Sequence, residues 1–374
     1  MAEPDELLNR LLVNATKQAN QSAIAQPEVR EKIDFVCRCM SNRAGVRLLM
    51  ACMLAKTQRP EVDPRKPYTE IGGDDCFSGR SYDERYLGRF INEHRLPCNS
   101  TTAFLTPTLR NQNAPLMPDT ELVGRPREVY KFTLELLDLV ARRKVKAEDV
   151  LTEALRVLVT MRDERFGRMK ELVAALSHGR GALPLSSEAI VTLLSQHLAC
   201  KHSSRLPVLI IAAAYRAAGA KIGEQIRRLN AHNAADEQTG ALGDVEVCLT
   251  NEDQVRTSYE MKSKRVTRDD IDRAMQKLAT VAERIDNYVF ITTDGIDDDI
   301  RDYVLAIYEQ SGGTEFVVLD CLGFVRHFLH FFHRSRLDFL DAYQELVLSE
   351  PDSAVSQSLK EAFLTLRQAA ESDE

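Results

Sequence analysis

Apolar residues recur at helical spacing over two long stretches and alternate with polar residues in the second half of the chain. Residues 3–56 and 128–178 carry apolar side chains roughly every three to four positions, which predicts helices. Residues 186–198 and 206–229 predict two further helices, the first of which begins at a serine.

Alternation with a period of two follows. Polar and apolar residues alternate over residues 241–249 and again over 256–264, with the polar residues 251–254 between them. This pattern predicts two strands that pair as a hairpin.

After the hairpin, helices and strands are expected to alternate. Thr267 is expected to cap the first helix. The pattern predicts helices over 268–284, over 297–310 and from Gly323 onward, and strands over 287–293 and 315–320. The predicted fold class is α/β, of the mixed α+β kind, with a largely helical N-terminal region.

The 374 residues are enough for two hydrophobic cores. We expect a mostly helical N-terminal region over residues 1–180, with an embedded loop segment at about 60–118. A catalytic α/β domain over 185–345 and a C-terminal helix with a frayed tail over 350–374 complete the predicted organisation. The glycines and proline of residues 177–184 predict the joint between the two domains.

Strand alternation also predicts which side chains of the hairpin share a face. One face is expected to gather polar and charged side chains from both strands: Asp244, Glu246, Cys248, Ser258, Glu260, Lys262 and Lys264. Val245, Val247 and Leu249 are expected on the opposite face.

This face carries residues suited to metal-dependent phosphodiester hydrolysis. Asp244 and Glu260 are candidate ligands of Mg²⁺, which prefers one or two carboxylates together with waters and substrate phosphate. Lys262 is the candidate residue that holds or helps to deprotonate the attacking water. Glu260-Met261-Lys262 is the only acid-x-Lys triplet in the chain. The alternative is a solvated hairpin with an ordinary ion pair.

The order of these elements and the positions of Asp244, Glu260 and Lys262 resemble the PD-(D/E)xK nuclease superfamily over residues 205–335. The resemblance implies a mixed sheet flanked by helices. Gly243 stands where the family usually has a proline. Glu224, which we expect on the helix before the hairpin, matches an auxiliary carboxylate of many members. It would bind a second metal ion or orient a water, or else be a plain exposed glutamate.

A second resemblance involves residues 68–86 and 96–111, which are similar to the SacI-type family of type II restriction endonucleases. It implies Mg²⁺-dependent cleavage of double-stranded DNA at a short palindrome by a homodimer. It also implies that a partner DNA methyltransferase protects the host, as a functional and not a physical partner.

The loop segment contains side chains that can bind DNA. Those of the kind that contact base edges are Asn99, Thr101, Thr102, Arg110, Asn111, Gln112 and Asn113. The alternative is that they cap turns in a connecting segment. Arg80, with Arg85, Arg89, Arg65 and Lys66 nearby, is a candidate phosphate contact or surface ion-pair partner.

Basic residues also follow the hairpin. Lys264 and Arg265, with Arg268 and Arg273, are expected to line a basic cleft beside the site, or else to pair with acidic residues of the same helix. The chain as a whole carries 49 basic and 56 acidic residues and a net charge of -7. This charge argues against a general nucleic-acid coat protein and leaves room for a local basic cleft.

The cysteines predict neither a zinc module nor a disulfide scaffold, because the eight cysteines form no CxxC pair. Reduced thiols, no signal-peptide pattern and no run of membrane-spanning length predict a cytoplasmic protein without a membrane partner.

We therefore expect a sequence-specific type II restriction endonuclease. Two alternatives stay open: a structure-selective repair or junction-resolving nuclease on the same core, and a catalytically inactive DNA-binding protein that keeps the fold.

Overall fold

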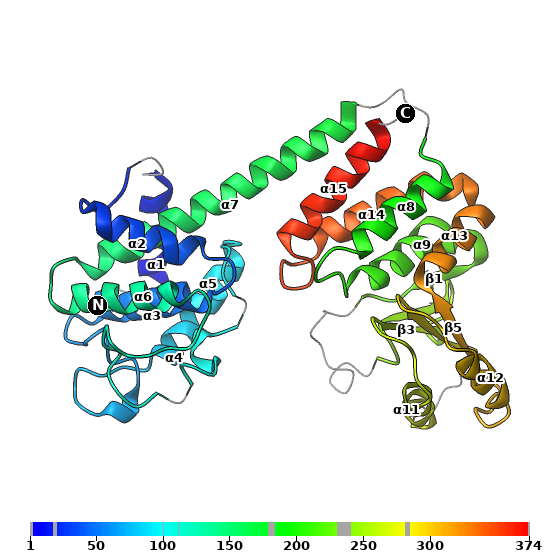
Figure 1. The fold of residues 1–374 in the computed structure, drawn as a ribbon, viewed down its shortest axis with the longest axis horizontal. Helices are drawn as coiled ribbons and strands as arrows, with labels where there is room; N and C mark the ends of the chain where they lie inside the picture. Colours follow the sequence, from blue (N-terminus) through cyan, green and yellow to red (C-terminus); the bar gives the residue numbers. More distant parts are fainter. Residues whose placement is uncertain are drawn as a thin grey trace. The chain divides into compact units, whose positions relative to one another are not determined.

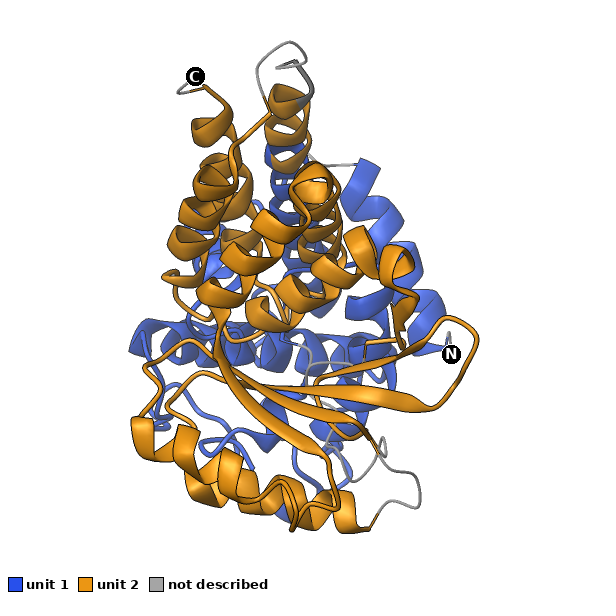
Figure 2. Cartoon of the chain, turned by 90° about the vertical axis from the view of Figure 1, so that its right-hand side faces the viewer, with its two compact units in different colours: residues 1–168 blue, residues 169–374 orange. Residues whose placement is uncertain are grey.

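The computed structural model describes residues 3–17, 21–99, 101–110, 112–178, 184–229, 241–280 and 285–372. The chain divides into two units, residues 1–168 and residues 169–374 (Figure 2). The division falls within helix α7 (Ala147–His178), a little before the joint expected at residues 177–184. Residues 179–183 of that joint lie outside the described residues.

The first unit is helical, as the apolar spacing predicts. Its long helices besides the first part of α7 are α1 (Pro4–Lys17), α2 (Pro27–Arg38), α3 (Ala44–Gln58) and α6 (Arg127–Ala141) (Figure 1). Every residue of α3 from Ala44 to Ala55 is buried, because this segment is apolar on all sides except at Arg47.

The segment at 60–118 combines loop with short helical elements. It contains η1 (Thr69–Ile71), α4 (Gly79–Tyr82), the π-helical turn η2 (Asp83–Leu87), α5 (Gly88–Glu93) and η3 (Ala103–Leu105). Residues 79–93 join three of these short elements into one continuous helical run. A buried ion pair between Arg47 and Asp83 anchors this run to α3, with 2.7 Å between Arg47 Nε and Asp83 Oδ1.

The second unit holds a five-stranded mixed sheet in the order β1-β2-β3-β4-β5. Its strands are β1 (Glu224–Ile226), β2 (Val245–Leu249), β3 (Val255–Lys262), β4 (Asn287–Thr292) and β5 (Glu315–Asp320). The pairs β1–β2 and β2–β3 are antiparallel, and β3–β4 and β4–β5 are parallel. The predicted hairpin and the two strands that follow it are confirmed.

Two local expectations about the hairpin region are wrong. Helix α9 (Leu206–Ile222) ends at Gly223, whose φ of 76° is left-handed, so Glu224 lies on strand β1 and not on a helix. The strict alternation along β2 also fails. The register shifts between Val247 and Cys248, which leaves Cys248 buried and Leu249 exposed.

Helices cover both faces of the sheet (Figure 1). The core beneath α11 (Arg268–Ala279) and α12 (Asp298–Ala306) includes Tyr288 and Phe290 of β4. Val289 and Ile291 of the same strand pack into the other core, together with α9 and α13 (Cys321–Phe331). Burial on both faces explains the continuous apolar run of β4. Thr267 caps α11, as predicted.

Three further helices complete this second core. They are α8 (Ser187–Leu198), α14 (Arg336–Ser349, preceded by η4, His333–Ser335) and α15 (Gln357–Ser372). His197 of α8 connects them, because its Nδ1 lies 3.0 Å from the Tyr343 hydroxyl of α14 and its Nε2 lies 3.0 Å from the Leu359 carbonyl of α15. Among the described residues, no helix combines the length and the apolar character needed to cross a membrane.

Candidate active site

Asp244 lies directly before β2, where the chain runs close to β3. Its N–H donates to the Tyr259 carbonyl at 2.8 Å, and its Oδ2 accepts the Met261 N–H at 2.8 Å. Asp244 is therefore hydrogen-bonded to the residues on either side of Glu260. These bonds hold the backbone of Asp244 beside that of Glu260 on the neighbouring strand.

Gly243 permits this close approach. A Cβ atom at Gly243 would lie 2.5 Å from Ser258 Oγ and 2.6 Å from the Tyr259 carbonyl oxygen. Both distances are shorter than nonbonded atoms tolerate in a packed interior. A proline at this position would bring the same Cβ atom, so the glycine suits the local backbone of this chain.

Glu260 and Lys262 lie two residues apart on β3 and share a face of the sheet. Lys262 Nζ is 3.2 Å from Glu260 Oε1. The Tyr288 hydroxyl, which donates to the Leu242 carbonyl at 3.0 Å, lies 3.4 Å from Glu260 Oε2. Because Tyr288 belongs to the core beneath α11 and α12, Glu260 and Lys262 lie on that side. The structure thus brings together Asp244, Glu260 and Lys262, as strand alternation predicts.

Asp270 of α11 joins this group. Its Oδ1 is 3.4 Å from Lys262 Nζ and 2.8 Å from an Arg273 guanidinium nitrogen. Its Oδ2 accepts the N–H and the hydroxyl of Thr267 at 3.0 and 2.7 Å, which completes a capping box. Burial acts to raise the pKa of Asp270, but the Thr267 hydrogen bonds and the Lys262 charge outweigh it and lower this pKa below its usual value.

Glu224 lies on the opposite face of the sheet. It contacts Tyr215 of α9, whose hydroxyl is 2.9 Å from the Tyr259 hydroxyl. Tyr259 packs into the α9 core, and Glu260, the next residue, points the other way. The structure therefore does not bring Glu224 together with Glu260. Burial raises the pKa of Glu224 against the opposing effect of the Tyr215 hydrogen bond.

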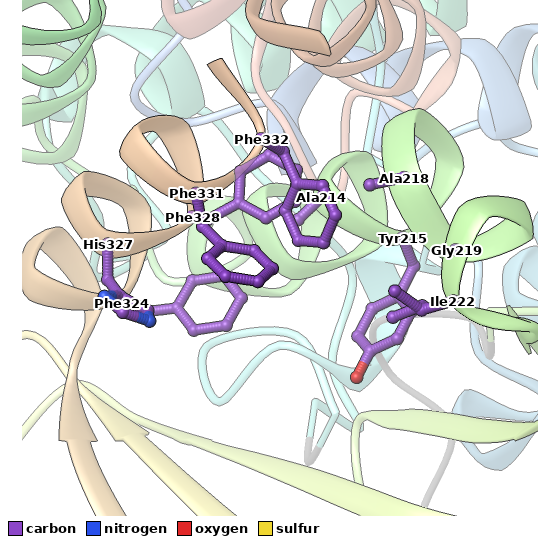
Figure 3. Close-up of a pocket in the computed structure, with 10 residues that line it drawn as sticks. All are labelled: Ala214, Tyr215, Ala218, Gly219, Ile222, Phe324, His327, Phe328, Phe331 and Phe332. Carbon is purple, nitrogen blue, oxygen red and sulfur yellow. The ribbon is translucent and has the colours of Figure 1, made fainter. Parts of the chain in front are cut away.

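A cavity of about 180 Å³ opens between α9 and α13. Figure 3 shows the rings of Phe324 and Phe328 on one wall and the ring of Tyr215 on the other. Apart from Tyr215 and His327 the walls are apolar. Because this cavity is on the α9 side of the sheet, it is separate from Lys262.

The carboxylates of Asp244 and Glu260 fit a Mg²⁺ ion, since both are hard oxygen donors at adjacent positions. The described residues contain no group of three or more His, Cys, Asp or Glu side chains arranged for a metal ion. Mg²⁺ does not require such a group, because waters and substrate phosphate supply its remaining ligands.

The candidate base-reading residues of the first unit have different surroundings. Thr101, Arg110 and Asn113 are exposed, and Asn99 and Gln112 are half-buried. Thr102 is buried, and its hydroxyl donates to Asp83 Oδ2 at 2.6 Å. The structure thus gives Thr102 a structural contact. Asn111 lies outside the described residues.

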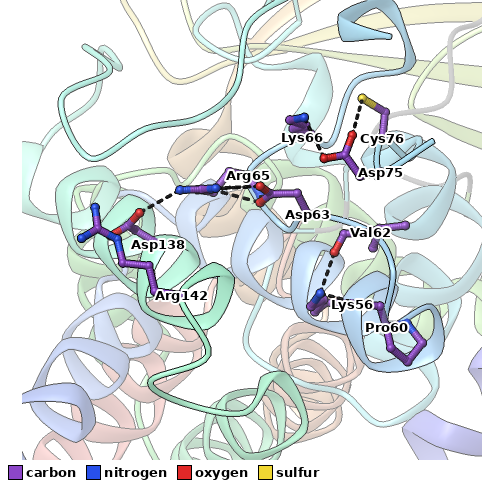
Figure 4. Close-up of polar contacts among 10 residues, drawn as sticks. All are labelled: Lys56, Pro60, Val62, Asp63, Arg65, Lys66, Asp75, Cys76, Asp138 and Arg142. Carbon is purple, nitrogen blue, oxygen red and sulfur yellow. Dashed lines mark hydrogen bonds and ion pairs between the residues drawn. The ribbon is translucent and has the colours of Figure 1, made fainter. Parts of the chain in front are cut away.

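Several basic residues near this segment form ion pairs. Arg65 contacts Asp63 at 2.7 Å and Asp138 at 3.0 Å, and Lys66 contacts Asp75 at 2.7 Å (Figure 4). Two further pairs follow the same pattern on the helical run at 79–93: Arg80 with Glu84 and Arg89 with Glu93. Arg80 is exposed and accessible to solvent on its helix.

Lys264 and Arg265 lie just beyond the end of β3, and both are exposed. Arg265 contacts Asp294, at 3.8 Å, and Asp297. Arg268 pairs with Asp299 at 3.4 Å. Arg265 and Arg268 thus pair with acidic residues, which was the alternative to a basic cleft. These partners lie after β4 or on α12, and not on the helix that follows the hairpin.

The sequence alone does not point to Asp270 or Tyr288 as residues of the site. Asp270 lies among the acidic residues expected to pair with nearby arginines, and Tyr288 lies in an apolar strand. The spacing Thr267-x-x-Asp270 signals a capping box, but contact with Lys262 depends on how α11 packs on the sheet.

No protein-family model matches this sequence, and a comparison with curated proteins finds no significant match.

Proposed function

We propose that this chain is a Mg²⁺-dependent endonuclease that hydrolyses phosphodiester bonds of double-stranded DNA, and that its second unit is a PD-(D/E)xK core. One observation carries the proposal: Asp244 is hydrogen-bonded on both sides of Glu260, and Lys262 Nζ lies 3.2 Å from Glu260. The Glu260 and Lys262 side chains are 22% and 29% exposed, which distinguishes them from a fully solvated surface pair.

Each residue has a defined role. Asp244 and Glu260 would hold the cation, and bound Mg²⁺ supplies charge stabilisation at the phosphoryl oxygen. Lys262 orients the attacking water beside Glu260 and offsets the negative charge that develops during the attack. Glu224 is not a ligand in this scheme, because it contacts Tyr215 on the other face of the sheet.

The first unit would supply sequence recognition. Exposed Thr101, Arg110 and Asn113 are side chains that can contact base edges, and exposed Arg80 suits a phosphate contact. A palindromic site matches the two-fold symmetry of a homodimer. In this proposal the enzyme acts in the cytoplasm, where a methyltransferase of matching specificity protects the host DNA.

The test is incubation of the purified protein with plasmid and phage DNA in Mg²⁺ and in EDTA, followed by sequencing of the ends. Discrete Mg²⁺-dependent fragments with one common end sequence are expected. Cleavage of branched substrates alone would favour a structure-selective nuclease, and intact DNA with every divalent cation would contradict the proposal.

A matched pair of variants assigns the activity to the site. Asp244→Asn removes a metal ligand, whereas Asp253→Asn makes the same change at an exposed position of the adjoining hairpin loop. Cleavage is expected to be lost in the first variant and retained in the second.

A further inference from the structure

Lys262 lies between two carboxylates. Its Nζ is 3.2 Å from Glu260 Oε1 on its own strand and 3.4 Å from Asp270 Oδ1 on α11. The Asp270 side chain is only 12% exposed, so this contact is largely shielded from water. The Lys262 ammonium therefore contacts helix α11 as well as its own strand, β3.

The two oxygens of Asp270 have different partners. Oδ2 accepts both hydrogen bonds from Thr267 and so fixes the carboxylate at the start of α11. Oδ1 faces Lys262 and also accepts from Arg273, whose side chain is 70% exposed. Because the cap fixes Oδ2, the position of Oδ1 is set by the helix and not by a freely rotating side chain.

Metal binding would change how strongly each of the two carboxylates, Glu260 and Asp270, attracts Lys262. A cation held by Glu260 would take up much of the negative charge that attracts Lys262 in the structure. Asp270 would then be the anionic partner that keeps Lys262 beside the site. Arg273 can turn toward solvent, since it is mostly exposed.

We propose that Asp270 is a positioning residue that holds the Lys262 ammonium in place for the attacking water. This inference rests on the proposed endonuclease function. Asp270 does not touch substrate or metal in this scheme; it acts only through Lys262.

The test is a double-mutant cycle under single-turnover conditions with plasmid DNA and Mg²⁺. Asp270→Asn keeps the shape of the side chain and an oxygen for Thr267 but removes the charge facing Lys262. We expect the cleavage rate to fall about 10- to 100-fold, as for other residues that orient a catalytic group, with little change in DNA affinity. In a Lys262→Ala background the same change is expected to alter the residual rate less than about twofold.

Asp269→Asn is the matched control. Asp269 is exposed in the same first turn of α11, so this variant removes an equal charge from the helix N-terminus without a contact to Lys262. Its cleavage rate is expected to match that of the unaltered protein.

Two results would overturn the positioning role alone: an equal loss from Asp270→Asn in both backgrounds, or an equal loss in Asp269→Asn. A protein that cuts no DNA before any substitution would instead overturn the endonuclease function and this role with it.

Discussion

The Asp244 carboxylate accepts a hydrogen bond of 2.8 Å from the backbone N–H of Met261, the residue directly after Glu260. The Asp244 side chain thus accepts a hydrogen bond from β3, and its backbone lies next to Glu260, the other candidate metal ligand. The backbone position of Asp244 and its proposed chemistry are therefore linked.

Replacing Asp244 or Lys262 by alanine is expected to reduce cleavage more than about 100-fold, because each removes a group that stabilises developing charge. DNA binding is expected to change little, since it depends on other contacts. Single-turnover cleavage and a gel-shift titration in Ca²⁺ measure the two effects. Loss of binding and folding together would contradict the assignment.

Gly243→Ala is expected to damage the site without touching a functional side chain. The added Cβ would meet the Tyr259 carbonyl and Ser258 Oγ, so the segment before β2 must move away from β3. We expect about 1–3 kcal/mol less free energy of unfolding and a large loss of cleavage. Urea unfolding and the cleavage assay measure these effects.

Gly167→Ala in α7 is the control for that substitution. A Cβ there meets nothing within 4 Å, and alanine favours a helix over glycine by about 1 kcal/mol. The free energy of unfolding is therefore expected to rise. If both glycine variants behave alike, the close contact at Gly243 is not responsible.

His197 is expected to make stability depend on pH. Burial lowers the pKa of His197 to about 4, although the hydrogen bond to the Leu359 carbonyl acts to raise it. Below about pH 6.5 the unfolded chain binds a proton that folded His197 does not bind until about pH 4. The free energy of unfolding should thus fall by on the order of 3 kcal/mol as pH drops through this window.

His197→Gln removes this titration. Urea unfolding at pH 4.5 and pH 7 should give a smaller pH difference in the variant than in the unaltered protein, even if the variant is less stable at both values. An unchanged difference would show that His197 does not contribute.

Asp83→Asn is expected to destabilise the first unit by about 3–5 kcal/mol, because it leaves the buried Arg47 guanidinium without a counter-charge. Asp83 also accepts from the Thr102 hydroxyl and the Ala103 N–H. Faster amide hydrogen exchange at Ala103 should accompany the lower urea midpoint. Arg89→Ala, which breaks an exposed pair with Glu93, should leave the midpoint unchanged.

The sequence predicts those features that local pattern determines. Alternation located the hairpin, and the Thr267 cap follows from the preference of threonine for helix N-termini. The adjacency of Asp244, Glu260 and Lys262 follows from strand periodicity once the hairpin is placed.

Features that depend on tertiary pairing were not predictable in the same way. Strand β1 exists because residues 224–226 pair with β2, and the residues themselves continue the helical pattern of α9. Gly223 was the local signal that the helix ends there. The helical run at 79–93 is joined to α3 by the buried contact between Arg47 and Asp83, two residues 36 positions apart in the chain.

The hydrogen bond from Met261 to Asp244 also has an evolutionary consequence. The Asp244 carboxylate satisfies a backbone donor of β3 and so has a role in folding whatever the chain does, whereas the Lys262 ammonium contacts the carboxylates of Glu260 and Asp270. Under the proposed endonuclease function, a related chain that keeps the aspartate but lacks the lysine is therefore expected to fold without cutting DNA.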